Sequence, residues 1–181
     1  DLSGWDVSNV TDMGSMFFGT ISETFGISGW DMSSVTDISE MFQNATNFNE
    51  DLSNWDVSNV TQMKFTFKNT QNFQGNLSTW NVSNVTDMSN MFQNSNWTGD
   101  ISEWDVSSVT NFGCTFCNNN TFNSDLSSWD VSSATNMGEM FGEASSFNSD
   151  ISNWDVSNVT NMSYTFRNTT SFNQDISSWD V

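Results

Sequence analysis

The chain has 181 residues, of which 35% are hydrophobic and 14% aromatic, and this apolar content is enough for a core and argues against disorder. Its formal net charge of −19 comes from 22 acids against three cations, so nucleic acid and anionic membrane surfaces are poor partners. No apolar run approaches the roughly 18 residues of a membrane span, so membrane insertion is not expected.

A tryptophan recurs along the whole chain with a step of 25 residues, shortened once to 24. The positions are Trp5, Trp30, Trp55, Trp80, Trp104, Trp129, Trp154 and Trp179. A fixed period of about 20 to 50 residues indicates a stacked array in which neighbouring units complete one another's core. The sequence therefore predicts a single elongated array of seven units over residues 1–181.

Each unit, counted from its Trp as position zero, predicts one short helix and one very short strand. Apolar residues at plus five, plus eight and plus twelve would line one helical face. Ser at plus three, such as Ser8, is a candidate N-cap, and Gly19 or Asn44 at plus fourteen suits a left-handed helix end. The stretch 48–53 suits the strand. This layout predicts a leucine-rich-repeat-like solenoid, with the Trp, Val, Met and Phe positions pointing inward.

Two units depart from the pattern. Unit one has Glu23 where the second Phe belongs and carries Phe25 two places later. Unit four is one residue short and has Trp97 at the Phe position.

Units reading W-D-V-S-N-V-T-x-M-x-x-M-F, followed by A-x-x-F-N-x-D-L-S, resemble the repeats of about 25 residues in bacterial surface lipoproteins, which are related to the BspA-like leucine-rich repeats. The resemblance covers every unit. It implies an extracellular, surface-exposed repeat protein, often adhesive, and it supplies no catalytic residues.

Two ladders of acidic residues run through the units. The first follows the Trp, as at Asp6 and Asp155, and the second lies four residues before it, as at Asp51 and Asp150. Calcium bound along the stack is one interpretation, since hard cations need several oxygen ligands. The favoured alternative is that each Asp accepts backbone N–H groups of a turn, because Asn81 replaces an Asp once and suits a turn better than a metal site.

The two cysteines, Cys114 and Cys117, are predicted to form a local disulfide in an oxidising compartment, and free thiols are the alternative. The same two positions of the third and seventh units hold aromatic–cation pairs, Phe65 with Lys68 and Tyr164 with Arg167. These pairs occur in alternate units. A lateral partner that contacts these four residues would explain the alternation, as would ancestral duplication of a 50-residue block.

Eleven N-x-S/T sequons invite N-linked glycosylation in a secreted protein. The better candidates are those whose hydroxyl partner the repeat does not require: Asn44, Asn96, Asn119 and Asn168, with Asn76 and Asn81 intermediate. The remaining sequons begin at Asn9, Asn59, Asn84 and Asn158, where the Thr belongs to the repeat itself, and at Asn161.

Both ends of the chain have the same repeat phase and neither looks like a cap, so the array is expected to continue, covalently or by end-on contact with another copy. The expected function is a non-enzymatic structural protein that lies within, or forms, an extracellular filament. A surface adhesin that recognises a host protein or glycan is the alternative. An enzyme is not expected, because the chain has no His and no unique acid–base pair.

Overall fold

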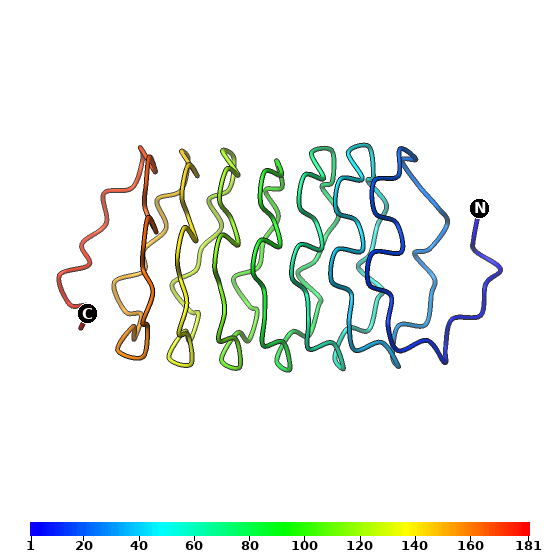
Figure 1. Cartoon of the computed structure of the whole chain (residues 1–181), viewed down its shortest axis with the longest axis horizontal. Coiled ribbons are helices and arrows are strands. Elements are labelled where there is room, and N and C mark those ends of the chain that lie inside the picture. The colour runs from blue at the N-terminus through cyan, green and yellow to red at the C-terminus, as the bar shows by residue number, and fades with distance from the viewer.

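The computed structural model describes residues 1–181 as one elongated stack of coils, with the two termini at opposite ends (Figure 1). Each 25-residue unit makes one turn of the stack. We number the coils 1 to 7 by the Trp that opens each: Trp5, Trp30, Trp55, Trp80, Trp104, Trp129 and Trp154.

The expected layout of one strand and one helix per coil is wrong, because the chain contains no helix and no strand longer than an isolated bridge. The bridges are parallel and join the plus-seven residues of successive coils, from Asp12 with Asp37 to Asn136 with Asn161. The stretch 48–53, expected to be a strand, contains no bridge.

Overlapping β-turns take the place of the expected helix. In coil 3, the N–H groups of Thr66, Lys68 and Thr70 each donate to the carbonyl three residues earlier, at 3.1–3.3 Å. The N–H groups between them, of Phe65, Phe67 and Asn69, donate at 2.9 Å to carbonyls of coil 4. Alternate amides therefore close a turn or bond the next coil, which satisfies the backbone without a helix.

Two residues per coil have positive φ, which a helix does not allow. They stand at plus ten and plus fourteen, as in Phe65 (60°) and Asn69 (59°) of coil 3. Each is the third residue of a hydrogen-bonded turn, the place where a type II turn requires positive φ. The Gly and Asn residues at plus fourteen thus adopt the predicted left-handed conformation, although they end a turn and not a helix.

The predicted inward positions are confirmed, and they form one continuous core. The Trp residues that open coils 2 to 7 are only 3–4% exposed. Phe rings at plus twelve stack from coil to coil at centroid distances of 5.6–5.9 Å. The second Phe of each coil packs on the first, as Phe48 does on Phe42 at 4.1 Å.

Tryptophan is required at position zero for a polar reason as well as an apolar one. The indole Nε1–H of Trp80 donates to the Leu52 carbonyl, 28 residues earlier, at 3.0 Å, and every later Trp at position zero makes the equivalent bond. The Thr at plus six is structural in the same way. In Thr36, both the N–H and the hydroxyl donate to the Thr11 carbonyl, at 2.8 and 3.1 Å.

The two irregular units keep the core filled. Phe25 reaches the place of the missing Phe and stacks on Phe17 at 4.3 Å. The displaced backbone is held by the buried Glu50, whose carboxylate accepts the N–H groups of the four residues 25–28. Trp97 stacks on Phe92 at 4.5 Å, and its indole N–H bonds the Gly75 carbonyl.

Candidate interaction surface

The acidic ladders lie outside the core, where their side chains fold back on the chain. Asp155 Oδ1 accepts the Ser157 N–H at 3.0 Å and the Ser157 hydroxyl at 2.7 Å. In the first ladder, Asn81 Oδ1 accepts the Ser83 N–H at 3.2 Å in the same way, and in the second ladder Asp150 accepts the Ser152 N–H at 3.0 Å. The turn interpretation of the Asp residues is therefore confirmed. No group of three or more His, Cys, Asp or Glu side chains gathers in metal-binding geometry.

These hydrogen bonds also set the acidity of the ladders. The side-chain and backbone bonds from Ser157 lower the pKa of Asp155 below its usual value, because they stabilise the carboxylate form. The pKa of Asp150 is lowered mainly by the backbone N–H of Ser152. Repulsion from the neighbouring coil, such as that of Asp125 on Asp150, is a smaller and opposing effect.

The sequon asparagines differ sharply in accessibility. Asn119 is fully buried and donates to Ser95 Oγ and the Trp97 carbonyl, so the folded chain has no room for a glycan there. Most of the others are tied to a neighbouring coil through the side-chain amide: Asn44, Asn59, Asn84, Asn96, Asn158, Asn161 and Asn168. The exposed residues whose amide nitrogen makes no bond are Asn9, Asn76 and Asn81.

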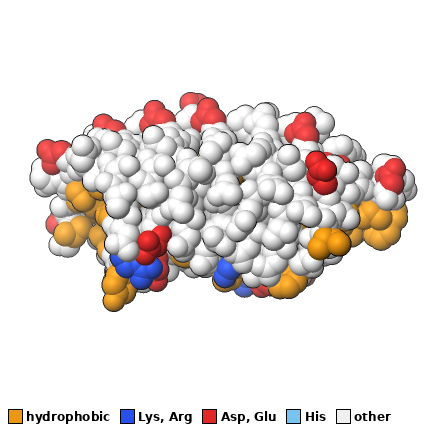
Figure 2. Space-filling model, turned by 90° about the horizontal axis from the view of Figure 1, so that it is seen from above, with side chains coloured by type: hydrophobic (Ala, Val, Ile, Leu, Met, Phe, Trp, Pro, Cys, Tyr) orange, Lys and Arg blue, Asp and Glu red, His pale blue; other side chains and the backbone are white.

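The overlapping turns build one long face of the stack, which we call the turn face and define as positions plus nine to plus fourteen of every coil. It holds all three cations of the chain, Lys64, Lys68 and Arg167. Figure 2 shows the Lys and Arg side chains along one long edge of the molecule and a row of acidic side chains along the opposite edge.

The aromatic–cation pairs on the turn face are in contact, as predicted, although a turn and not a helix joins them. Lys68 Nζ lies 5.1 Å from the centre of the Phe65 ring, and Arg167 lies 5.5 Å from that of Tyr164. Tyr164 is 63% exposed. In coil 5, Cys114 and Cys117 occupy the same two positions, with Cα atoms 4.8 Å apart, and are disulfide-bonded in the structure.

Only one of the three cations is paired with carboxylates inside the chain. Arg167 bridges Glu139 at 3.5 Å and Glu143 at 3.4 Å, both from the preceding coil. Lys64 and Lys68 make no salt bridge. The face therefore offers two positive charges without a salt bridge beside the half-buried Phe65 ring.

The alternation between even-numbered and odd-numbered coils extends into the core. At plus eleven, coils 2, 4 and 6 bury Met, while coils 3, 5 and 7 carry Thr. The hydroxyl of Thr66 donates to the carbonyls of Met63 and, in the previous coil, Ile38. The buried column at plus eleven thus alternates large and small side chains.

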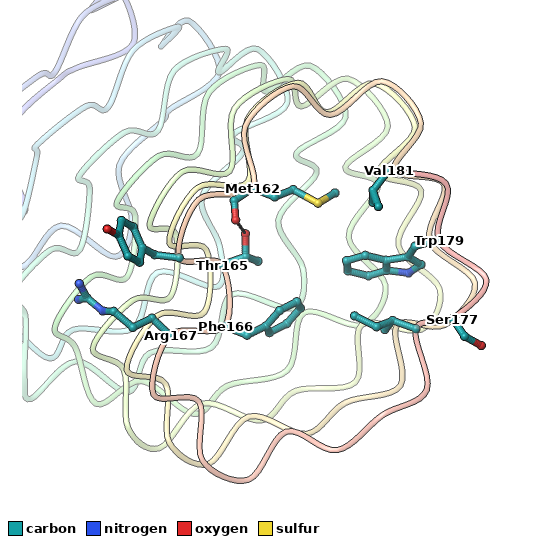
Figure 3. Close-up of a pocket in the computed structure, with 9 residues that line it drawn as sticks. Met162, Thr165, Phe166, Arg167, Ser177, Trp179 and Val181 are labelled. Carbon is teal, nitrogen blue, oxygen red and sulfur yellow. Dashed lines mark hydrogen bonds between the residues drawn. The ribbon is translucent and has the colours of Figure 1, made fainter.

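A second surface with apolar character is the end of the stack near Val181. A hollow of about 750 Å³ is lined there by residues that include Met162, Phe166, Ile176 and Trp179. Figure 3 shows the Phe166 and Trp179 rings inside the last coil, facing one another across it, with Arg167 pointing outward. Their equivalents in inner coils are buried under the next coil.

No helix in the structure is long and apolar enough to cross a membrane. Neither a curated protein nor a solved structure matches the chain. One family, described as "Mycoplasma protein of unknown function, DUF285", matches residues 1–98 and again 93–181, and so covers the chain with two successive matches. The chain belongs to this repeat family.

Proposed function

We propose, from membership of this repeat family and from the stacked coils, that the chain is a non-enzymatic structural segment of a cell-surface protein. The observation that carries the proposal is that backbone, core and polar ladders all repeat from coil to coil. Interactions of this kind give a stiff element whose length is set by the number of coils.

The chemistry of the acidic residues supports a structural role. Catalysis by a carboxylate pair needs two carboxyl groups in different environments, with pKa values set apart. The ladder carboxylates instead repeat one environment, and in Asp130 and Asp155, for example, the pKa is lowered by the serine two residues on.

A stack in which every coil repeats the same contacts with its neighbours would suit a place within an extracellular filament. N-linked glycans are proposed for Asn76 and Asn81, which are exposed and have free amide nitrogens.

The exposed aromatic rings of the turn face favour a second candidate function, a surface adhesin. Phe18 is 48% exposed and Tyr164 63% exposed, and aromatic and Arg side chains are enriched in protein interfaces. A host protein or glycan would then bind this face.

Imaging of the native material tests the structural proposal. Antibodies raised against the folded segment should label intact cells, and negative-stain images of the purified parent protein should show rods. Labelling only after cell lysis, or compact particles without rods, would refute the proposal. Rods that end at a single globular ligand would favour the adhesin. Peptide mapping of the same material reports on glycans at Asn76 and Asn81.

A further inference from the structure

The bridges from Arg167 to Glu139 and Glu143 account for part of the charge order on the turn face, and neither the core nor the repeat explains the rest. Counted from coil 2 to coil 7, the formal charges at plus nine to plus fourteen are −1, +2, 0, 0, −2 and +1. They come from Glu40, from Lys64 and Lys68, from Glu139 and Glu143, and from Arg167. The sequence of charges changes sign when it is read backwards.

This antisymmetry has a direct geometric meaning. If a second copy is laid antiparallel on the first, about a two-fold axis between coils 4 and 5, coil 2 meets coil 7 and coil 3 meets coil 6. Every charged coil then faces a coil of equal and opposite charge, and coils 4 and 5, which carry no charge on the face, meet one another. Coil 1, also uncharged there, has no counterpart. A two-fold interface is self-complementary in this way.

We propose that two copies of this chain pair antiparallel through their turn faces, with the two-fold axis between coils 4 and 5. Lys64 and Lys68 of each copy then lie opposite the Glu139 and Glu143 carboxylates of the other. This contact extends the proposed structural role, because each rod would consist of two paired chains. It does not depend on where in the cell the protein lies.

Neither ancestral duplication of a 50-residue block nor the acidic residues at the border of the face explain the order of charges on the turn face. A duplicated 50-residue block would give coils 3 and 5 the same charge, but coil 5 carries the Cys114–Cys117 pair and no charge. The carboxylates Asp12, Asp37 and Asp87 lie at the border of the face at plus seven, where each already accepts the N–H group two residues on. Opposite charges placed face to face fix the register of a contact and disfavour other partners.

Sedimentation equilibrium on the intact chain and on a charge-swap set tests the proposal. Lys68→Glu and Glu139→Lys should each weaken dimerisation by about tenfold or more, because each puts like charges face to face. The double variant should restore the wild-type Kd to within about threefold, the spread expected for approximate additivity. Residues 68 and 139 lie three coils apart, roughly 14 Å at one rung spacing per coil, so the rescue cannot arise within one copy.

Glu103→Lys is the matched control, since it makes the same charge change at an exposed position outside the turn face. It should not weaken the dimer, because it lowers the overall repulsion between two chains of charge −19. Unchanged urea midpoints for all variants show that folding is intact.

Zero-length carbodiimide cross-linking supplies the geometry. Isopeptide bonds from Lys64 or Lys68 to Glu139 or Glu143 are expected in the dimer band. Within one chain these residues lie three coils apart, and an isopeptide bond is too short to join them. A chain that stays monomeric, a double variant that fails to regain the dimer, or a dimer that lacks these cross-links would overturn the proposal. The proposed surface role would survive each of these results.

Discussion

At the scale of single residues, the stack depends on side chains that bond across coils in addition to filling the core. Tryptophan at position zero does both, since its ring packs in the ladder while its N–H bonds a carbonyl 28 residues earlier, as Trp80 does to Leu52. The period and the inward direction of this residue were predictable from the sequence. The indole bond was not, because spacing alone does not say which carbonyl a ring will reach.

Replacement of Trp80 separates these two contributions. Trp80→Phe should lower the free energy of unfolding by about 1–2 kcal/mol, because the buried indole bond is lost while most of the apolar contact remains. Trp80→Ala should cost about 3–5 kcal/mol. Urea unfolding followed by tryptophan fluorescence measures both. Trp5→Phe is the control, since Trp5 is 56% exposed and makes no indole bond, and a Trp80→Phe effect no larger than that of Trp5→Phe would contradict this role.

The carboxylate ladders predict a specific dependence on pH. The two hydrogen bonds from Ser157 lower the pKa of Asp155 in the folded chain. The Asp155 carboxylate therefore stabilises the fold above its unfolded pKa of about 3.9, and this contribution is lost as the pH falls through the lower folded pKa. The Asp155→Asn variant keeps a side-chain oxygen that can accept the Ser157 N–H, as Asn81 does for Ser83, but this side chain does not titrate. The melting temperature of the wild type should exceed that of this variant at neutral pH, and the difference should vanish in acid. A difference that stays constant from neutral pH to about pH 2, below the unfolded value, would rule out the linkage.

At the scale of elements, the spacing of apolar residues predicted a helix where the chain forms a run of turns. Apolar residues at plus five, eight and twelve have the spacing of a helical face, but a run of overlapping turns brings the same positions inward. The Gly or Asn at plus fourteen is a visible signal of positive φ. The plus-ten residue gives none, because residues as different as Ser15, Glu40 and Phe65 all adopt φ near 60° there. A single residue with positive φ inside the segment is enough to exclude a helix.

Substitution at plus fourteen tests the turn backbone directly. Asn94 has φ of 52°, and its side-chain amide bonds Asn69. Asn94→Gly and Asn94→Val both lose that amide bond, so the difference between them reports the backbone alone. The valine variant should be less stable by about 1–2 kcal/mol, since a β-branched residue resists positive φ. Equal urea midpoints for the two variants would show that this position does not hold a left-handed conformation in solution.

The turn in coil 5 makes a chemical prediction. Because Cys114 and Cys117 replace an aromatic–cation pair whose members touch in coils 3 and 7, we expect a disulfide across this turn in freshly isolated protein. Intact mass after alkylation should show two added groups only when a reductant is used first. Alkylation of both thiols without reductant would contradict the prediction.

At the scale of the whole molecule, the central claim is that each 25-residue unit is one coil that contacts only its neighbours. The repeat and the continuous core followed from the period of the tryptophans. The order of charges on the turn face became meaningful only once the coils were placed in a stack, because it compares residues about 75 apart in the chain.

Deletion of one complete coil tests this claim most directly. Removal of residues 55–79, from one Trp to the residue before the next, should leave a folded stack, shorter by one rung of about 4.8 Å in its maximum dimension by small-angle X-ray scattering. Removal of residues 55–66 shifts every following core position out of phase, and this chain should not fold. If the complete-coil deletion is unfolded, or if the two deletions behave alike, then the unit of the sequence is not the unit of the structure.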